Sequence, residues 1–128
     1  MDKLKSKSIY RSSCEKYYLP QRNQREVRAA LKKDVAPVSK MIKVLSDPVR
    51  LRIMLALSVQ ELCVCVLVEI TDYRYSALSY HLKLLKKMGF IDSRREGTFL
   101  LYRLTDSGRV GLEMITRLSK IAKEKKPG

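Results

Sequence analysis

The chain has 128 residues, of which 27 are Lys or Arg, 13 are Asp or Glu and 45% are hydrophobic, so its net charge is +14. This length predicts one domain, and no stretch approaches the ~20 apolar residues that a membrane span needs. The three cysteines cannot all pair, which argues against a secreted disulfide scaffold and for a reducing, cytoplasmic setting. The basic excess is typical of nucleic-acid binders, because each Lys or Arg placed on a phosphate releases counterions, so nucleic acid is the expected partner and a membrane is not.

Composition divides the chain into three parts. Residues 1–20 are rich in Lys, Ser and Tyr and show no clear hydrophobic period, so we expect a flexible N-terminal arm. One folded domain is expected over residues 21–123, followed by a short basic tail over residues 124–128.

Three helices are expected in the first half of this domain. A short apolar stripe predicts a helix over residues 21–33. Apolar residues at i, i+3, i+4 and i+7 predict a second helix over residues 38–45, after an interruption at Pro37. Asp47 followed by Pro48 is the pattern of a helix N-cap with proline in the first turn, so a third helix is expected to begin there.

The next segment, residues 61–71, is apolar almost throughout. Its valines favour a strand, but the segments that follow complete a helix-turn-helix, so we expect a helix here. Residues 76–88 show the clearest pattern of the chain. Leucines line one face of this predicted helix, Ser, Tyr and Lys side chains lie roughly opposite, and Gly89 provides the C-terminal stop.

The remaining residues predict a hairpin and a last helix. Two short strands, over residues 90–95 and 98–104, are expected around a turn at Gly97. Thr105 or Asp106 can cap a final helix with a single apolar stripe. The predicted fold is therefore mainly α with a small β-hairpin, arranged as a winged helix-turn-helix.

The polar face of the helix over residues 76–88 has the side chains that a DNA-reading helix needs. Ser and Tyr hydroxyls can exchange hydrogen bonds with base edges, and Lys and Arg can reach guanine or phosphates. A merely solvated face explains this helix alone as well, but the adjoining basic hairpin and the net charge favour double-stranded DNA. The candidate DNA-binding residues are Arg74, Ser76, Ser79, Tyr80, Lys83, Lys87, Arg94 and Arg95.

His81 is the only histidine of the chain. It borders the apolar face of the same helix, so we interpret it as a packed or capping side chain rather than a ligand or a base. A nucleophilic cysteine needs an oriented base and an oxyanion hole, and the sequence shows neither. We therefore expect the protein not to be an enzyme.

Cys63 and Cys65 form a Cys-x-Cys pair at the start of the expected helix over residues 61–71. Packing is one interpretation, because free cysteines are often small buried hydrophobes. Ion binding is the other. On a regular helix these positions point about 200° apart, so both thiols can reach one ion only where the backbone bends, as a fraying first turn can. A helix N-terminus also favours the thiolates that bind metals, and a bound ion would strain the DNA-reading unit.

Thiolate ligands select soft ions. Two sulfurs are too few for a stable site, and Cys14 in the arm is the only further thiol. Three sulfurs suit arsenite, antimonite or lead, whereas four-coordinate cadmium or zinc would need an added oxygen or nitrogen ligand. A redox switch stays open as well, in which Cys63 or Cys65 pairs with Cys14, because a bond within the Cys-x-Cys pair would be strained.

Four segments together resemble the ArsR/SmtB family of metal-responsive winged-helix repressors, over roughly residues 38–104. These segments are Leu45-Ser46-Asp47-Pro48-Val49-Arg50-Leu51-Arg52-Ile53, Glu61-Leu62-Cys63-Val64-Cys65, Ser79-Tyr80-His81-Leu82, and Arg95-Glu96-Gly97 with Tyr102. The resemblance implies a homodimer built from the terminal helices, which binds a partly palindromic operator and is released when the ion binds. An arm cysteine recruited to the Cys-x-Cys pair resembles the arrangement in cadmium- and lead-sensing members.

The chain departs from the family pattern at several positions. Val66 stands where an aspartate usually follows the second cysteine, and Val68 stands where arsenic-sensing members have a third cysteine. Asp72 replaces a glycine of the turn, and the final helix lacks the ligands of the family's zinc site. We expect a repressor released by arsenite or antimonite, with cadmium or lead, or a thiol-based redox response, as the alternatives.

Overall fold

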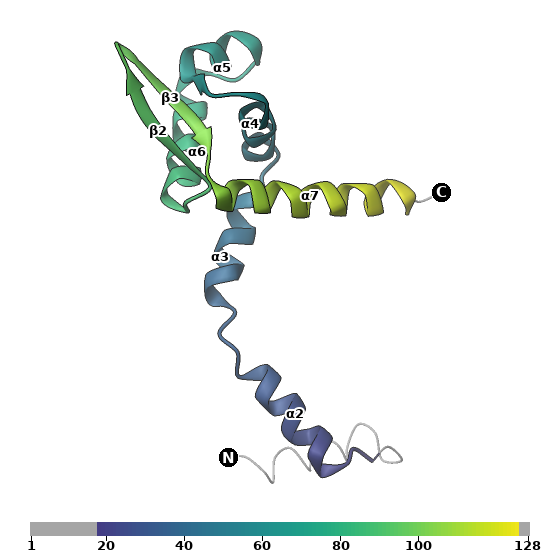
Figure 1. Ribbon diagram of the computed structural model, residues 1–128. Coiled ribbons are helices and arrows are strands. Elements are labelled where there is room, and N and C mark those ends of the chain that lie inside the picture. Colours follow the sequence, from purple (N-terminus) through teal and green to yellow (C-terminus); the bar gives the residue numbers. More distant parts are fainter. Residues whose placement is uncertain (1–17, 126–128) are drawn as a thin grey trace. The chain divides into compact units, whose positions relative to one another are not determined.

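The computed structural model describes residues 18–125. It divides the chain into two compact units, with the boundary between Val35 and Ala36, inside the domain expected over residues 21–123. The first unit contains α2 (Gln21–Leu31), which has no buried residue (Figure 1). Most of the expected arm and tail, and Cys14 with them, lie outside the described residues.

The second unit combines helices with a small sheet (Figure 1). Its described elements are, in chain order, α3 (Ala36–Leu45), α4 (Pro48–Val59), β1 (Leu62–Cys63), α5 (Val64–Ile70), α6 (Tyr75–Lys87), β2 (Ile91–Glu96), β3 (Phe99–Leu104) and α7 (Asp106–Glu124). This order confirms the predicted mainly α fold with a hairpin. None of the helices in residues 18–125 is long and apolar enough to cross a membrane.

Local signals begin and end these helices where the sequence predicts. The Asp47 carboxylate accepts hydrogen bonds from the N–H groups of Val49 and Arg50, at 2.8 and 3.2 Å, and thereby caps α4. Gly89 has a φ of +87°, which a residue with a side chain rarely adopts, and it lies directly beyond the C-cap of α6. The Thr105 hydroxyl caps α7 by accepting from the Gly108 N–H at 3.1 Å.

The sheet differs from the predicted hairpin by one strand. β2 and β3 pair antiparallel from Ile91 opposite Leu104 to Glu96 opposite Phe99, and the short β1 pairs with the other edge of β3. The helix expected over residues 61–71 is therefore wrong at its start, and α5 begins only at Val64. The physical reason is that the backbone groups of β1 are satisfied by β3, about 40 residues further along the chain.

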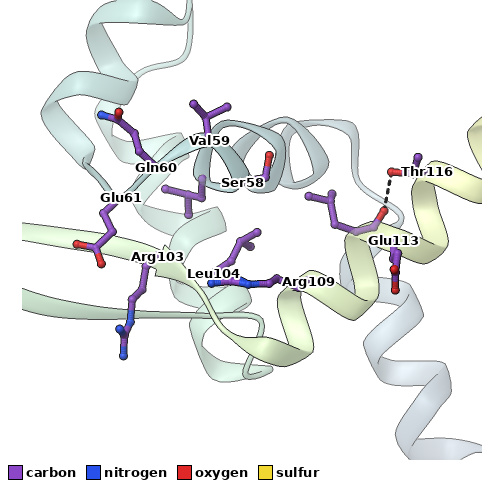
Figure 2. A pocket seen from close by; sticks show the side chains of 11 residues that line it. Ser58, Val59, Gln60, Glu61, Arg103, Leu104, Arg109, Glu113 and Thr116 are labelled. Carbon is purple, nitrogen blue, oxygen red and sulfur yellow. Dashed lines mark hydrogen bonds between the residues drawn. The ribbon is translucent and has the colours of Figure 1, made fainter.

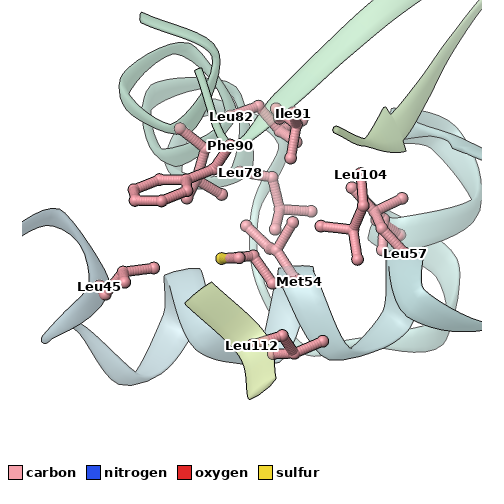
Figure 3. Close-up of a cluster of buried hydrophobic side chains, with 12 residues drawn as sticks. Leu45, Met54, Leu57, Leu78, Leu82, Phe90, Ile91, Leu104 and Leu112 are labelled. Carbon is pink, nitrogen blue, oxygen red and sulfur yellow. The ribbon is translucent and has the colours of Figure 1, made fainter. Parts of the chain in front are cut away.

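The core of the second unit lies where α4, α6 and the base of the hairpin meet (Figure 3). Met54, Leu78 and Leu85 are completely buried there, and Phe90 and Ile91 join them at the start of β2. α7 closes the core through Gly108. A Cβ atom at this position would overlap the carbonyl oxygen of Phe90, so only glycine allows the two backbones to approach this closely.

Candidate DNA-binding surface and thiol site

α6 presents the face that the sequence predicts for DNA reading. Leu78, Leu82 and Leu85 anchor the helix in the core. The five predicted side chains on the opposite face are all exposed: Ser76, Ser79, Tyr80, Lys83 and Lys87. Arg74 is the N-cap residue, and its guanidinium is exposed and makes no ion pair with any residue in 18–125. The helix thus offers hydroxyl groups and cations on a rigid support.

One neighbouring residue was missed by the sequence analysis. Tyr75, the first residue of α6, is 60% exposed. Burial raises the pKa of Tyr102 above its usual value, and the nearby Tyr75 adds to this effect. The sequence could have indicated Tyr75 through its position between Arg74 and Ser76, which are both predicted DNA-binding residues.

The hairpin formed by β2 and β3, which we call the wing, holds its basic residues in two different ways. Arg95 is exposed and makes no ion pair with any residue in 18–125. Arg94 donates to Glu96 and, at 2.8 Å, to Glu61, and these two hydrogen bonds raise its pKa. The positive charge of Arg94 is therefore compensated by two carboxylates, whereas that of Arg95 is available to DNA.

α6, which we call the recognition helix, is also tied directly to the wing. The Lys86 ammonium group on α6 donates to the Ser93 hydroxyl on β2 at 2.7 Å. Further along the wing, the Arg103 guanidinium donates to Asp92 at 2.7 Å and lowers the pKa of that carboxyl group. The first contact ties the wing to α6, and the second joins the two strands of the wing.

His81 lies in a structural network, as the sequence analysis interprets it. The Arg50 guanidinium contacts His81 Nδ1 at 3.1 Å and also donates to the Val44 carbonyl oxygen at 2.7 Å. Because a guanidinium can only donate, Nδ1 of His81 is the acceptor. The ring also makes an edge-on contact with Tyr80. This network joins α3, α4 and α6.

Cys63 and Cys65 come together at the start of α5. Cys63 ends β1 and serves as the N-cap residue of α5, with an extended backbone at φ −87° and ψ 159°, and Cys65 lies in the first turn of the helix. The extended cap removes the divergence of about 200° that a continuous helix would impose. The two Cα atoms are 5.4 Å apart and a disulfide joins the sulfurs.

This bond corrects one expectation. The sequence analysis expected an oxidised pair to include Cys14, whereas the structure joins Cys63 to Cys65. The physical reason is the extended cap, which brings their Cα atoms within the range of about 4.4–6.8 Å that bridged cysteines usually show. Cys63 is 8% exposed and Cys65 is exposed, so the pair is reached from the surface.

A third ligand for an ion is not found near this pair within the described part of the chain. No three His, Cys, Asp or Glu side chains in residues 18–125 are grouped so that they could hold a metal ion. The predicted third ligand, Cys14, lies outside these residues. The described residues thus supply two sulfurs, joined here in a disulfide, and no third ligand beside them.

The thiol pair lies next to the wing, because β1, which ends at Cys63, pairs directly with β3. Cys63 lies opposite Leu101 of β3, and Leu101 in turn lies opposite Arg94 of β2, so the three residues form one row across the sheet. Glu61, two residues before Cys63, holds Arg94. A change in backbone at the pair would reach the wing through β1 and the start of α6 through α5.

A cavity of mixed polarity lies elsewhere in this unit. It has a volume of about 480 Å³ and lies between the end of α4 and the start of α7 (Figure 2). Its charged lining residues are of both signs: Glu61, Arg103, Arg109 and Glu113. Neither cysteine lines this cavity, so the thiol pair forms a separate surface site.

The recognition helix, the wing and their exposed cations define a winged helix-turn-helix transcriptional regulator. Comparison with known proteins supports this class. The family described as "Bacterial regulatory protein, arsR family" matches residues 47–93. The "Cadmium resistance transcriptional regulatory protein CadC homolog" of Staphylococcus aureus is 36% identical over 95 residues, which are 73% of this chain and 78% of that protein.

Two further similarities extend the comparison. The "Arsenical resistance operon repressor" of Staphylococcus xylosus is 40% identical over 67 residues, 52% of this chain and 64% of that protein. The solution structure of the homodimeric winged helix-turn-helix DNA-binding domain of Mb0332 from Mycobacterium bovis has a TM-score of 0.61 and 29% identity, and the match covers 76% of this chain and 85% of that one. The chain belongs to the ArsR family of bacterial regulators. Family membership confirms the predicted resemblance and the expectation that the protein is not an enzyme.

Proposed function

We propose that this protein is a homodimeric transcriptional repressor that leaves its operator when a thiophilic ion binds Cys63 and Cys65. The observation that carries the proposal is the extended cap of α5, which brings the buried Cys63 and the exposed Cys65 together beside β3 of the wing. In the reduced protein, Cys14 would supply the third sulfur. Arg74, Ser76, Ser79, Tyr80, Lys83, Lys87 and Arg95 would contact the DNA.

Arsenite or antimonite is the first candidate ion, because three thiolates and no further ligand suit these ions. Cadmium or lead is the alternative. The aligned S. aureus relative is named for cadmium resistance, and its similarity covers more of this chain than that of the S. xylosus arsenical repressor. The two ions therefore have to be compared on the same protein.

The release mechanism follows from where the pair lies. Two thiolates on one ion fix the cap residue and the first turn of α5 in one arrangement. β1 pairs with β3 of the wing, and α5 packs on α6. The restraint at the pair would therefore act on both the wing and α6. A difference of a few kcal/mol between the DNA-binding arrangement and the ion-bound one is enough for release.

A groove between α3 and α7 supports the homodimer. It has a volume of about 300 Å³ and an almost entirely apolar lining. Val38, Ile42, Val110 and Met114 in this lining are each 45–57% exposed. Leu118 and Ile121 continue the apolar stripe of α7 and are equally exposed. A second copy of the chain, placing the same surface against this one, would cover the groove.

The experiment that tests the proposal measures the anisotropy of a labelled duplex from upstream of the protein's own gene. Under reducing conditions, stoichiometric arsenite, antimonite, cadmium, lead or zinc is added to the complex. We expect one of the thiophilic ions to release the DNA and zinc to leave it bound. Tight binding that none of these ions relieves would contradict the proposal.

The matched variants are Cys63→Ser and Cys65→Ser, which remove one ligand each and almost no volume. We expect both to bind the operator with nearly the wild-type Kd and to remain bound when the inducing ion is added. Unchanged release from either variant would show that the ion acts elsewhere.

The bond between Cys63 and Cys65 supports a second candidate function, a repressor that responds to oxidation. Its test is the same titration with a mild oxidant in place of the ion. Release by the oxidant, reversed by dithiothreitol and absent in Cys65→Ser, would favour this function over ion sensing.

A further inference from the structure

The helix of the first unit, α2, carries a row of cations. Arg22, Arg25, Arg28 and Lys32 follow each other at steps of three, three and four residues. At about 100° per residue, these steps place all four on one side of the helix. Val27 and Leu31 lie on the opposite side and are 49% and 79% exposed, so α2 has a basic face and a separate apolar face.

The helix dipole explains only part of this row. Arg28 in the last turn and Lys32 at the C-cap lie where the dipole favours cations, whereas Arg22 lies in the first turn, where it disfavours them and where no acidic residue compensates. Like charges at spacings of three and four residues also repel each other on a helix surface. No ion pair within residues 18–125 involves any of the four cations. A polyanion bound along the row would relieve all of these unfavourable terms together.

The length of the row suits a duplex. Ten residues separate Arg22 from Lys32, which is about 15 Å along the helix axis. Double-stranded DNA carries about one phosphate charge per 1.7 Å of its own axis. Several phosphates therefore fall within reach of a helix of this length that lies along the backbone.

We propose that α2 binds DNA phosphates and that this contact adds to those made by α6 and the wing. This inference rests on the proposed DNA-binding function and enlarges its contact surface. The contact is independent of base sequence, because lysine and arginine on phosphates position a protein without reading bases. It adds affinity for the operator and for random DNA alike.

The experiment uses the full chain and the dependence of log Kd on log salt concentration. In the test variant, Arg22, Arg25, Arg28 and Lys32 are all replaced by Gln, which keeps helix propensity and removes four charges. If two of these side chains reach phosphates in each subunit of a dimer, the slope falls by about 3–4 units, on operator and on random duplexes.

A second variant controls for net charge. It replaces four exposed cations of α7 and its C-cap by Gln: Arg117, Lys120, Lys123 and Lys125. We expect its slope to stay within about one unit of wild type. A third variant with the changes Arg22→Lys, Arg25→Lys and Arg28→Lys keeps the charge and should keep the slope, which separates a charge effect from damage to α2.

The outcomes distinguish this inference from the proposed function. If the α2 variant keeps the wild-type slope while the ion still releases the operator, the inference is wrong and the proposed function stands. Equal losses in the α2 and α7 variants would also overturn it, since net charge alone would then explain the effect. Loss of binding to phosphatidylglycerol vesicles with an unchanged slope on DNA would assign α2 to a membrane instead. A wild-type chain that binds no duplex would overturn both.

Discussion

Two basic residues that look equivalent in the sequence should behave differently on DNA. Lys83 on α6 is exposed and makes no ion pair with any residue in 18–125, whereas Arg94 on the wing is held by Glu61 and Glu96. The perturbation is therefore a pair of variants. Lys83→Gln removes a free charge, and the double variant Glu61→Gln with Arg94→Gln removes an existing ion pair without changing the net charge.

The magnitude follows from the contacts. Each phosphate contact contributes about 0.9 to the slope of log Kd against log salt, so the loss of Lys83 from both subunits of a dimer should lower the slope by about 1.8. Arg94 could reach a phosphate only after leaving two carboxylates, one of them 2.8 Å away. We therefore expect the double variant to keep the wild-type slope within about 0.3. Its urea unfolding midpoint should stay close to that of the wild type, as is usual when an exposed ion pair is removed.

The assay is fluorescence anisotropy of the operator duplex at several potassium chloride concentrations, with no ion or oxidant present. Urea unfolding of each variant serves as the control for stability. A slope that falls as far in the double variant as in Lys83→Gln would refute the reasoning, because it would place Arg94 on a phosphate despite its two acidic partners.

Three further predictions concern the fold and the assembly. Gly108→Ala should destabilise the protein by about 1–3 kcal/mol in urea, because its methyl group meets the Phe90 carbonyl, while Gly111→Ala, which meets only movable side-chain atoms, should be nearly neutral. An equal effect of both changes would argue against this backbone contact. Asp47→Ala should cost about 1 kcal/mol at neutral pH through loss of the α4 cap. Burial alone would raise the pKa of Asp47, but the hydrogen bonds from Arg50 and Val49 outweigh it and lower the pKa below 3.8. The contribution of the cap to stability is therefore present above about pH 4 and is lost as the pH falls through the pKa of the folded state. The difference in free energy of unfolding between wild type and Asp47→Ala, measured with a chemical denaturant, should therefore vanish in acid. A difference that persists there would contradict the cap. Met114→Glu should give a monomer by sedimentation velocity, and an intact dimer would exclude the groove between α3 and α7 as the interface.

Much of the fold was predictable because its signals are local. The cap at Asp47, the stop at Gly89 and the leucine spacing of α6 each involve residues within a few positions of one another. Backbone conformation responds to such neighbours directly. The same spacing predicted which face of α6 is exposed, and the structure confirms this for all five polar side chains.

Two features of the candidate site depend on residues that are far apart in the chain. Residues 61–65 are as compatible with a strand as with a helix when read alone, and only the open edge of β3 makes Leu62 and Cys63 a strand. Arg94 looked available to DNA because its partner Glu61 lies 33 residues earlier in the chain. No pattern within a short window could show this ion pair.

By itself, the sequence determined a basic winged helix-turn-helix with a Cys-x-Cys pair at the start of its reading unit. These properties follow from composition, periodicity and caps. Tertiary structure decided that Cys63 ends a strand of the wing sheet and that its thiol meets Cys65 across an extended cap. The reason is that strand pairing satisfies backbone groups far apart in the chain, and this pairing makes the thiol pair part of the sheet that carries the wing.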